Sequence, residues 1–401
     1  MNNNISYIKN KTPKSDCEKS LSLMEPEVIA KIQKFHMSFP QYKETPLVSL
    51  DNLAKKLGVG GIYIKDESHR FGLNSFKALG CTFAIAGYIA GRLGISVWEL
   101  DYNTLPEAAA RLGELTFFAA TDGNHGRAVA WAARELGQKA VIFMNKGCPE
   151  VRLGHIKREG AEASISELNY DDTIRFVTEL AAKTPNSVIV QDTAWEGYED
   201  IPGWIMQGYA VMALEACRQM EEKNIQPTHM LLQAGVGAFA GSAQGFVSNY
   251  YGKNDPVSFI VEPSVADCYF QSAKKGDGST VNVSGEMKTI MAGLACGEPS
   301  SLSWEILKNK SDYFVTIEDV HAANAMRALA APLQGDGKII SGESGASAMG
   351  FLLELLSSQS TAGLREEAGV NKDSRFLLFS TEGDTDPQNY IDIVRNGKYS
   401  K

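Results

Sequence analysis

Short apolar runs alternate along this chain with stretches of helical periodicity, and this alternation limits the folds open to it. Several runs are apolar throughout, which is typical of strands covered on both faces. Strands interleaved with helices predict an α/β fold with parallel or mixed sheets covered by helices. We expect strands at Gly61–Lys65, Leu115–Ala120, Ala140–Met144, Ala163–Ser166, Ser187–Val190, His229–Gln233, Val257–Val261 and Arg375–Phe379, and helices at Ser75–Arg92, Gly126–Gly137, Asp171–Lys183 and ending near Arg158.

The elements between Leu115 and Lys183 follow one another closely enough to form a small sheet of their own. We therefore expect a two-lobed molecule, in which residues 89–189 form a small inserted lobe and residues 1–88 and 190–401 form a larger one. A chain of 401 residues is long enough to give such an enzyme a substantial core. Two sheets that face each other leave a cleft between the lobes.

Charge and hydropathy exclude several classes of partner. The net charge of -9 gives no basic surface for nucleic acid or anionic lipid. No apolar run is long enough for a membrane span, and the polar residues 1–16 lack the apolar core of a secretory signal. We therefore expect a cytoplasmic enzyme acting on a small molecule, with a loosely held N-terminal arm.

Six cysteines are scattered along the chain without a C-x-x-C pair, so we expect no zinc or other metal centre. Free thiols are the expectation in a reducing cytosol. Two alternatives stay open: a regulatory disulfide between Cys268 and Cys296, and a monovalent cation held by loop oxygens.

Lys77 follows Ser75 and Phe76 and opens an apolar stretch, so its ammonium should be partly withdrawn from water. Desolvation disfavours the charged form and predicts a lowered pKa for Lys77. A neutral amine can form a Schiff base with an aldehyde, which is how pyridoxal phosphate is held. The alternative is an exposed lysine at the start of a helix.

The segment Thr121–Gly126 lies between a predicted strand and a predicted helix. Its two glycines allow the backbone to approach a planar ligand, Asn124 offers an amide, and Asp122 offers a carboxylate at the end of a strand. A helix-capping turn is the alternative. His125 in this position is more often structural.

A glycine-rich loop, Ala234–Ser242, follows the predicted strand at His229–Gln233. Free N–H groups at the positive end of a helix suit a phosphate. The spacing G-x-G-x-x-x-G and the absence of a G-K-[ST] ending argue against a dinucleotide fold and a nucleotide P-loop. The loop therefore predicts a cup for a single phosphate.

Three further polar segments can contribute to a site. Ser380 and Thr381 follow the last predicted strand, where a hydroxyl can hydrogen-bond a pyridine nitrogen; an acidic turn is the alternative. Gln191–Tyr198 follows a strand and brings a second carboxylate, Asp192, for which a helix or turn cap is the alternative. Ser341–Ala346 begins an apolar helix.

Together these segments resemble the fold-type II pyridoxal-phosphate enzymes, the group of threonine dehydratase, threonine synthase and the tryptophan synthase β chain. The resemblance runs from about Thr45 to Asp386, and its landmarks keep their order: Thr45–Leu47, Lys65–Ser68, Ser75–Lys77, Gly123–Gly126, the glycine loop and Ser380–Asp384. Within the group the chain is most similar to the diaminopropionate ammonia-lyases, on the segments Arg70–Lys77, Ala120–Gly126, Gln191–Tyr198, Trp204–Tyr209 and Met291–Pro299. Asp122 and Asp192 separate these from threonine dehydratase.

The resemblance implies a pyridoxal 5′-phosphate cofactor in the cleft between the lobes. It implies that Lys77 is the Schiff-base lysine and that Asn124 hydrogen-bonds the 3-hydroxyl. It assigns the phosphate to the loop Gly235, Val236, Gly237, Ala238 and Gly241, and the pyridine nitrogen to Ser380 or Thr381. Ser380 matches the tryptophan synthase pattern better, but the choice stays open. It also implies a homodimer and a mobile lid between Cys268 and Cys296.

The activity implied is α,β-elimination of ammonia from 2,3-diaminopropionate, giving pyruvate. Lys77 is expected to take the α-proton of the L isomer, and the resemblance implies that Asp122 takes that of the D isomer from the opposite cofactor face. Asp192 is expected to position the substrate amine or assist its protonation. A serine or threonine dehydratase is the alternative enzyme, and a cofactor-free effector-binding relative is the alternative outside enzymes.

Overall fold

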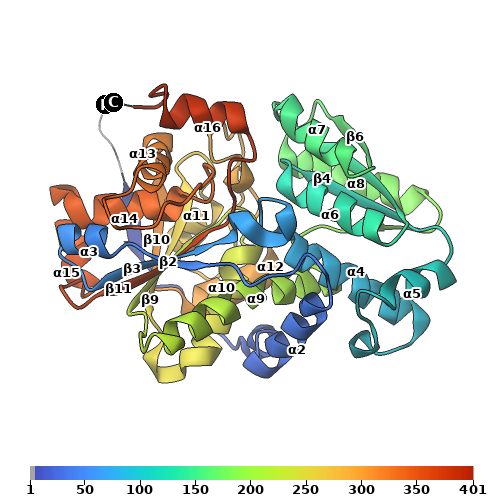
Figure 1. The fold of residues 1–401 in the computed structure, drawn as a ribbon, viewed down its shortest axis with the longest axis horizontal. Helices are drawn as coiled ribbons and strands as arrows, with labels where there is room; N and C mark the ends of the chain where they lie inside the picture. The colour runs from blue at the N-terminus through green and yellow to red at the C-terminus, as the bar shows by residue number, and fades with distance from the viewer. Residues whose placement is uncertain (1–4, 401) are drawn as a thin grey trace.

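The computed structural model describes residues 5–400 and has two lobes, each built around its own sheet (Figure 1). The larger sheet has the strand order β1-β10-β9-β8-β11-β3-β2, with bounds β1 Ser6–Lys9, β10 Tyr313–Ile317, β9 Val257–Pro263, β8 His229–Gln233, β11 Arg375–Ser380, β3 Gly61–Asp66 and β2 Leu47–Ser49. The smaller has the order β6-β5-β4-β7, with bounds β6 Glu162–Ile165, β5 Lys139–Met144, β4 Thr116–Thr121 and β7 Ser187–Ile189.

The larger sheet is mixed, because its two edge strands β1 and β2 run antiparallel to their neighbours while the interior strands are parallel. The smaller sheet is parallel throughout. In the centre of the larger sheet Leu377 of β11 pairs with Met230 of β8 on one side and with Tyr63 of β3 on the other. The predicted two-lobed α/β architecture is therefore confirmed.

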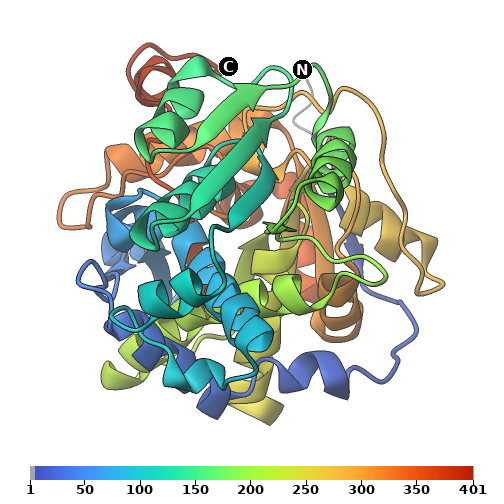
Figure 2. The same ribbon diagram turned by 90° about the vertical axis from the view of Figure 1, so that its right-hand side faces the viewer.

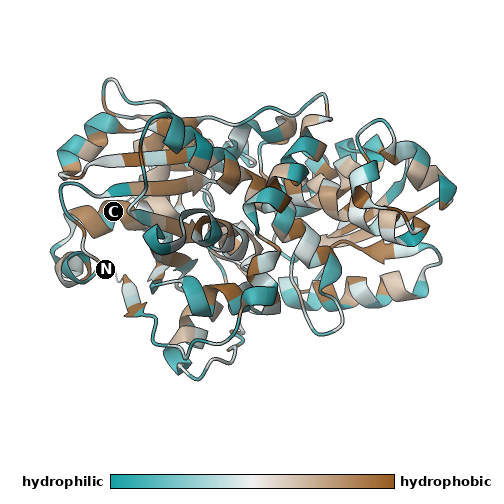
Figure 3. Cartoon of the chain, turned by 90° about the horizontal axis from the view of Figure 1, so that it is seen from below, coloured by the Kyte–Doolittle hydropathy of each residue, from teal (hydrophilic) through white to brown (hydrophobic). Residues whose placement is uncertain are grey.

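Successive side chains of the larger sheet enter two different hydrophobic cores, as the two-residue period of a strand requires. Leu377 and Phe379 of β11 enter one core, and Phe376 and Leu378 enter the other. Figure 3 shows largely hydrophobic strands between helices along which hydrophilic and hydrophobic residues alternate. The first core is covered by α1 Glu18–Ser22, α2 Pro26–Met37, α4 Lys77–Leu93, α9 Asp200–Glu222, α10 Ala238–Tyr251, α11 Cys268–Lys275 and α12 Ser301–Lys310, and the second by α3 Asp51–Leu57, α13 Asp319–Ala330, α14 Ser347–Ser357, α15 Ala362–Glu367 and α16 Pro387–Val394.

The strands of the smaller sheet lie within residues 116–189, side by side at the front of Figure 2. Their helices are α6 Asn124–Glu135, α7 Glu150–Arg158 and α8 Tyr170–Lys183, and α5 Leu105–Arg111 precedes them. The first core continues from the larger lobe into this one through α4, which packs against both α9 and α6.

Helix α4 carries Lys77 as its first residue, and glycines let it approach α9 closely. A Cβ at Gly208 of α9 would lie 2.3 Å from the Leu79 carbonyl oxygen, and one at Gly80 would lie 2.5 Å from the Tyr209 ring. Only glycine fits such a separation. The close packing of α4 on α9 thus fixes the position from which Lys77 extends.

Most predicted elements are confirmed to within a few residues at their ends, and β8 has the predicted bounds. The expectation of a loose N-terminal arm is wrong for Ser6–Lys9, which forms β1 beside β10; residues 1–4 lie outside the described part. Asn10 secures this strand by donating from Nδ2 to the carbonyls of Lys308 and Ser311. Strands β2 and β10 were not predicted. Between residues 5 and 400, no helix has the length and apolar character needed to cross a membrane.

Candidate active site

A cleft opens between the lobes where the carboxyl ends of parallel strands meet, the place where α/β sheets bind ligands. The space in it that no atom fills is about 500 Å³, part of which is open solvent. Its lining comes from the start of α4, from loops after β4, β7, β8 and β11, and from Gly293, Leu294 and Ser344. It includes the predicted residues Lys77, Asp122, Asn124, Asp192, Gly235, Val236, Gly237, Ala238 and Thr381. Two predicted site residues, Gly241 and Ser380, lie outside this lining.

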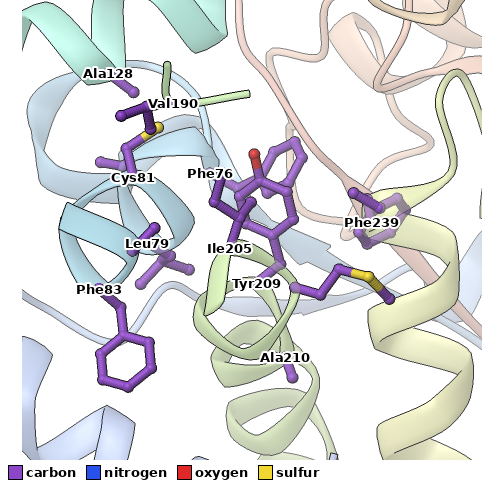
Figure 4. Close-up of a cluster of buried hydrophobic side chains, with 14 of the residues drawn as sticks. Phe76, Leu79, Cys81, Phe83, Ala128, Val190, Ile205, Tyr209, Ala210 and Phe239 are labelled. Carbon is purple, nitrogen blue, oxygen red and sulfur yellow. The ribbon is translucent and has the colours of Figure 1, made fainter. Parts of the chain in front are cut away.

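The Lys77 side chain extends into the cleft, where its Nζ lies 2.5 Å from Asp192 Oδ2. The rings of Phe76 and Tyr209 lie 5.1 and 5.4 Å from Nζ and pack edge to face on each other (Figure 4). Burial by itself lowers the pKa of Lys77, but the Asp192 carboxylate outweighs burial and raises that pKa. The predicted lowering of the pKa of Lys77 is therefore wrong, because its counter-charge lies 115 positions away along the chain.

Asp192 is 1% exposed and accepts hydrogen bonds from Lys77 and from the Tyr209 hydroxyl at 3.1 Å. Burial would raise the pKa of Asp192, but the Lys77 ammonium and the Tyr209 hydroxyl hold that pKa below its usual range. Asp192 therefore stays a carboxylate throughout the physiological pH range. The alternative of a simple turn cap does not account for its two partners in the cleft.

His125 is a buried structural neighbour of this pair. Its Nε2 lies 2.8 Å from the Val190 carbonyl, which can only accept, so Nε2 carries the proton. Burial lowers the pKa of His125, so the ring is neutral, and its Nδ1 lone pair faces the Cys81 thiol at 3.6 Å. His125 Nδ1 lies 3.8 Å from Asp192 Oδ2, but the neutral ring places no positive charge beside that carboxylate.

Asp122 follows β4 and is held by Arg152 of α7, whose Nη1 lies 3.2 Å from Asp122 Oδ2. Arg152 is 4% exposed, and its Nη2 lies 3.9 Å from Glu343 in the larger lobe. Its Nε has no partner among residues 5–400. One buried guanidinium thus orients the cleft carboxylate and reaches across to the other lobe.

The loop after β8 forms a cradle at the N-terminus of α10. Gly237 has φ of +92°, and a Cβ there would lie 2.0 Å from the Tyr269 hydroxyl oxygen. That hydroxyl donates to the Val236 carbonyl at 2.7 Å, and the Ser300 N–H donates to the same oxygen at 3.0 Å. Within residues 5–400, nothing accepts from the N–H groups of Gly235, Val236 or Gly237. Unpaired N–H groups at the start of a helix fit a phosphate.

Gly241 has a packing position instead. Its N–H donates to the Gly237 carbonyl at 2.7 Å within the first turn of α10. A Cβ there would lie 3.0 Å from Ser303 of α12, so glycine allows the two helices to approach.

The two candidate hydroxyls after β11 differ in their surroundings. Thr381 lines the cleft, and its Oγ1 accepts from Gln233 Nε2 at 3.0 Å. Ser380 Oγ lies outside the lining and donates to Ser341 Oγ at 2.8 Å. These positions favour Thr381 as the hydroxyl available to a ligand.

Asn124 lines the cleft and donates from Nδ2 to Glu382 at 2.5 Å. Glu382 is 2% exposed and also accepts from the Ser344 N–H at 3.0 Å. Sequence reasoning missed Glu382, Arg152 and Gln233. Glu382 lies in the acidic turn Ser380–Asp384, whereas the other two residues belong to no local motif, so only the fold identifies them.

The amine, the cradle of unpaired N–H groups and the Thr381 hydroxyl together fit pyridoxal 5′-phosphate, and residues 39–365 match the family model described as pyridoxal-phosphate dependent enzyme. A diaminopropionate ammonia-lyase of Salmonella typhimurium is 47% identical over 383 residues, covering 94% of this chain and 95% of the relative. The chain belongs to the diaminopropionate ammonia-lyase family. Its cofactor is pyridoxal 5′-phosphate, as the matching family model describes.

Solved structures agree with this membership. The crystal structure of an Escherichia coli diaminopropionate ammonia lyase in complex with D-serine has a TM-score of 0.92 and 44% identity, covering 99% of this chain and 98% of the other. The same enzyme in complex with an aminoacrylate-PLP azomethine reaction intermediate has a TM-score of 0.90 at 44% identity, with the same coverage. The predicted resemblance to diaminopropionate ammonia-lyases is confirmed.

Proposed function

We propose that this chain eliminates ammonia from 2,3-diaminopropionate, in both its D and L isomers, and that water then releases pyruvate and a second ammonia. The observation that carries the proposal is that an amine, Lys77, and two carboxylates, Asp122 and Asp192, line one cleft beside a glycine cradle. Relatives that are 47–48% identical bear the name of this activity.

Pyridoxal 5′-phosphate, when bound, supplies an aldehyde that links to the substrate's α-amino group and a conjugated ring that accepts electrons from the α-carbon. Lys77 holds the cofactor between turnovers and takes the α-proton of the L isomer. Asp122 takes the α-proton of the D isomer, and Arg152 keeps that carboxylate oriented. Gly235, Val236, Gly237 and Ala238 bind the phosphate through backbone N–H groups.

The β-amino group has to leave as ammonia, which requires that it be protonated beforehand. Asp192 is a buried carboxylate and so supplies the counter-charge that a β-ammonium needs away from water. The α C–H bond breaks first, and its proton passes to Lys77 or Asp122 while its electrons would be accepted by the conjugated ring that the cofactor supplies. Those electrons then form a Cα–Cβ double bond as the β C–N bond breaks, and the electrons of the C–N bond leave with neutral ammonia.

A serine dehydratase is the second candidate, because one similar structure holds D-serine. The test is a comparison of pyruvate release from D- and L-diaminopropionate with release from D- and L-serine at matched concentrations. We expect diaminopropionate to be the faster substrate in both configurations, with two ammonia released for each pyruvate. Faster release from serine would replace the proposal with the dehydratase.

We extend the proposal to a cytoplasmic homodimer. All six cysteines are free, which fits a reducing compartment, and the dimer is suggested by the family resemblance. Light scattering on the purified holoenzyme tests the dimer, and a monomeric mass would contradict it.

A further inference from the structure

Gln233, the last residue of β8, occupies a buried position beside the end of β11 and is 2% exposed. Its Nε2 lies 2.9 Å from the Phe379 carbonyl oxygen and 3.0 Å from Thr381 Oγ1. A carbonyl oxygen can only accept a hydrogen bond, so the side-chain atom that faces it has to be the amide nitrogen. The Phe379 carbonyl thus determines which way round the Gln233 amide lies.

The orientation of the Gln233 amide also determines the role of the Thr381 hydroxyl in their hydrogen bond. The Gln233 nitrogen can only donate, so Thr381 Oγ1 accepts from it, and the hydroxyl hydrogen is left to point elsewhere. Among residues 5–400, nothing accepts that hydrogen, and Thr381 lines the cleft. Ser380 differs, because its hydroxyl donates to Ser341.

The Gln233 amide oxygen is buried without a donor among residues 5–400. Leaving a buried acceptor unpaired has a free-energy cost, and such a group calls for an explanation beyond packing. The orientation is therefore maintained by the two donations from Nε2 even though it leaves the oxygen unsatisfied.

We propose that Gln233 is a positioning residue that turns the Thr381 hydroxyl into a hydrogen-bond donor toward the ring nitrogen of pyridoxal 5′-phosphate. A neutral hydroxyl donor stabilises the unprotonated nitrogen, whereas a carboxylate there would favour the protonated one. The inference rests on the cofactor and on the cleft of the proposed function, but it does not depend on which amino acid is the substrate.

Gln233→Glu is the decisive variant because it keeps the shape and removes the double donor. Neither protonation state of the new carboxyl group can donate to both Phe379 and Thr381, so the Thr381 hydroxyl turns to donate to the carboxyl group. Gln233→Met removes the polar group and leaves the hydroxyl free to rotate. Thr381→Val, close in size, removes the hydroxyl and serves as the matched background.

The measurements are the dissociation constant for pyridoxal 5′-phosphate and the pH dependence of the visible absorbance of the bound cofactor, both without substrate. We expect Gln233→Glu to weaken cofactor binding by about tenfold or more, and to shift the pH dependence by at least about half a unit. We expect Gln233→Met to weaken binding by about threefold.

In the Thr381→Val background, adding either Gln233 substitution should change binding by less than about twofold, because the two residues act as one unit. Equal fold-losses with and without the Thr381 hydroxyl would overturn the proposal, as would wild-type binding and absorbance in Gln233→Glu. If Gln233→Glu fails to fold, the same comparison of cofactor binding is made for Gln233→Met, alone and in the Thr381→Val background. Both readouts are taken without substrate, so they do not depend on whether the enzyme turns over diaminopropionate. The role of Gln233 and the proposed function are therefore tested separately.

Discussion

Replacing Asp192 by asparagine removes the counter-charge of the Lys77 ammonium while preserving the shape of the side chain. Removing one partner of a buried ion pair costs about 3–5 kcal/mol, because the other charge is left uncompensated. The variant can instead fold with Lys77 in its neutral form. Removing the proton from an amine with the ordinary pKa of 10.5 costs about 5 kcal/mol at pH 7 and about 2 kcal/mol at pH 9.

The destabilisation should therefore depend on pH. In the wild-type protein the raised pKa of Lys77 contributes stability below pH 10.5 that is lost as the pH rises through the folded value. The lowered pKa of Asp192 contributes stability above pH 3.8 that is lost as the pH falls through the folded value. Both contributions are complete at pH 7, and at pH 9 they are nearly so. The loss should fall from about 3–5 kcal/mol at pH 7 to about 2 kcal/mol at pH 9.

Urea denaturation of cofactor-free protein, in which Lys77 carries a free amine, measures this loss at both pH values. Asp172→Asn is the matched control, because Asp172 pairs with Arg175 on the surface at 2.6 Å, with side chains 49% and 56% exposed. The control should lose less than about 1 kcal/mol at either pH. A loss for Asp192→Asn that is equal at pH 7 and pH 9, or no larger than the control, would show that Asp192 does not stabilise the Lys77 ammonium.

Three further predictions concern the cradle, the base and a buried ion cluster. Gly237→Ala should weaken cofactor binding by at least about thirtyfold in equilibrium dialysis, because its Cβ would displace Tyr269 and strain a left-handed backbone; a change below about threefold contradicts this. Arg152→Met should lower kcat/KM for D-diaminopropionate about tenfold and spare the L isomer, because Asp122 loses its partner; an equal loss for both isomers counts against it. Arg70→Met should cost the holoenzyme about 3–5 kcal/mol in urea denaturation at pH 7, because fully buried Glu67 loses its ion-pair partner and Glu215 keeps only its pair with Lys65; a loss below about 1 kcal/mol would be inconsistent.

The fold was predictable to the extent that local patterns encode it. The continuous apolar runs that became β3, β8 and β11 are buried on both faces, so their composition alone identifies them. Strand β1 was not predictable, because Ser6–Lys9 is a four-residue run with one aliphatic side chain and gains its hydrogen bonds from the edge of β10. Local sequence carries no record of such a long-range partner.

The residues of the candidate site also fall into a group that the sequence predicts and a group that it does not. Lys77, Asp122 and the glycine cradle were predictable, because each lies in a short motif at the end of a strand or the start of a helix. The charge state of Lys77 was not, since it depends on Asp192 across the cleft. Arg152 and Gln233 were also missed, because a lone arginine or glutamine on a helix or strand gains its role only from partners that tertiary structure supplies.

We propose that Lys77 and Asp122 serve the two isomers of diaminopropionate as separate bases. The most direct measurement is kcat/KM for D- and L-diaminopropionate in the wild-type enzyme and in Asp122→Asn, followed by pyruvate release. Loss of a general base lowers the rate by about 10²–10⁴-fold, so we expect a loss of that size for the D isomer and less than about threefold for the L isomer. Equal losses for both isomers would contradict the assignment of separate bases to the two isomers.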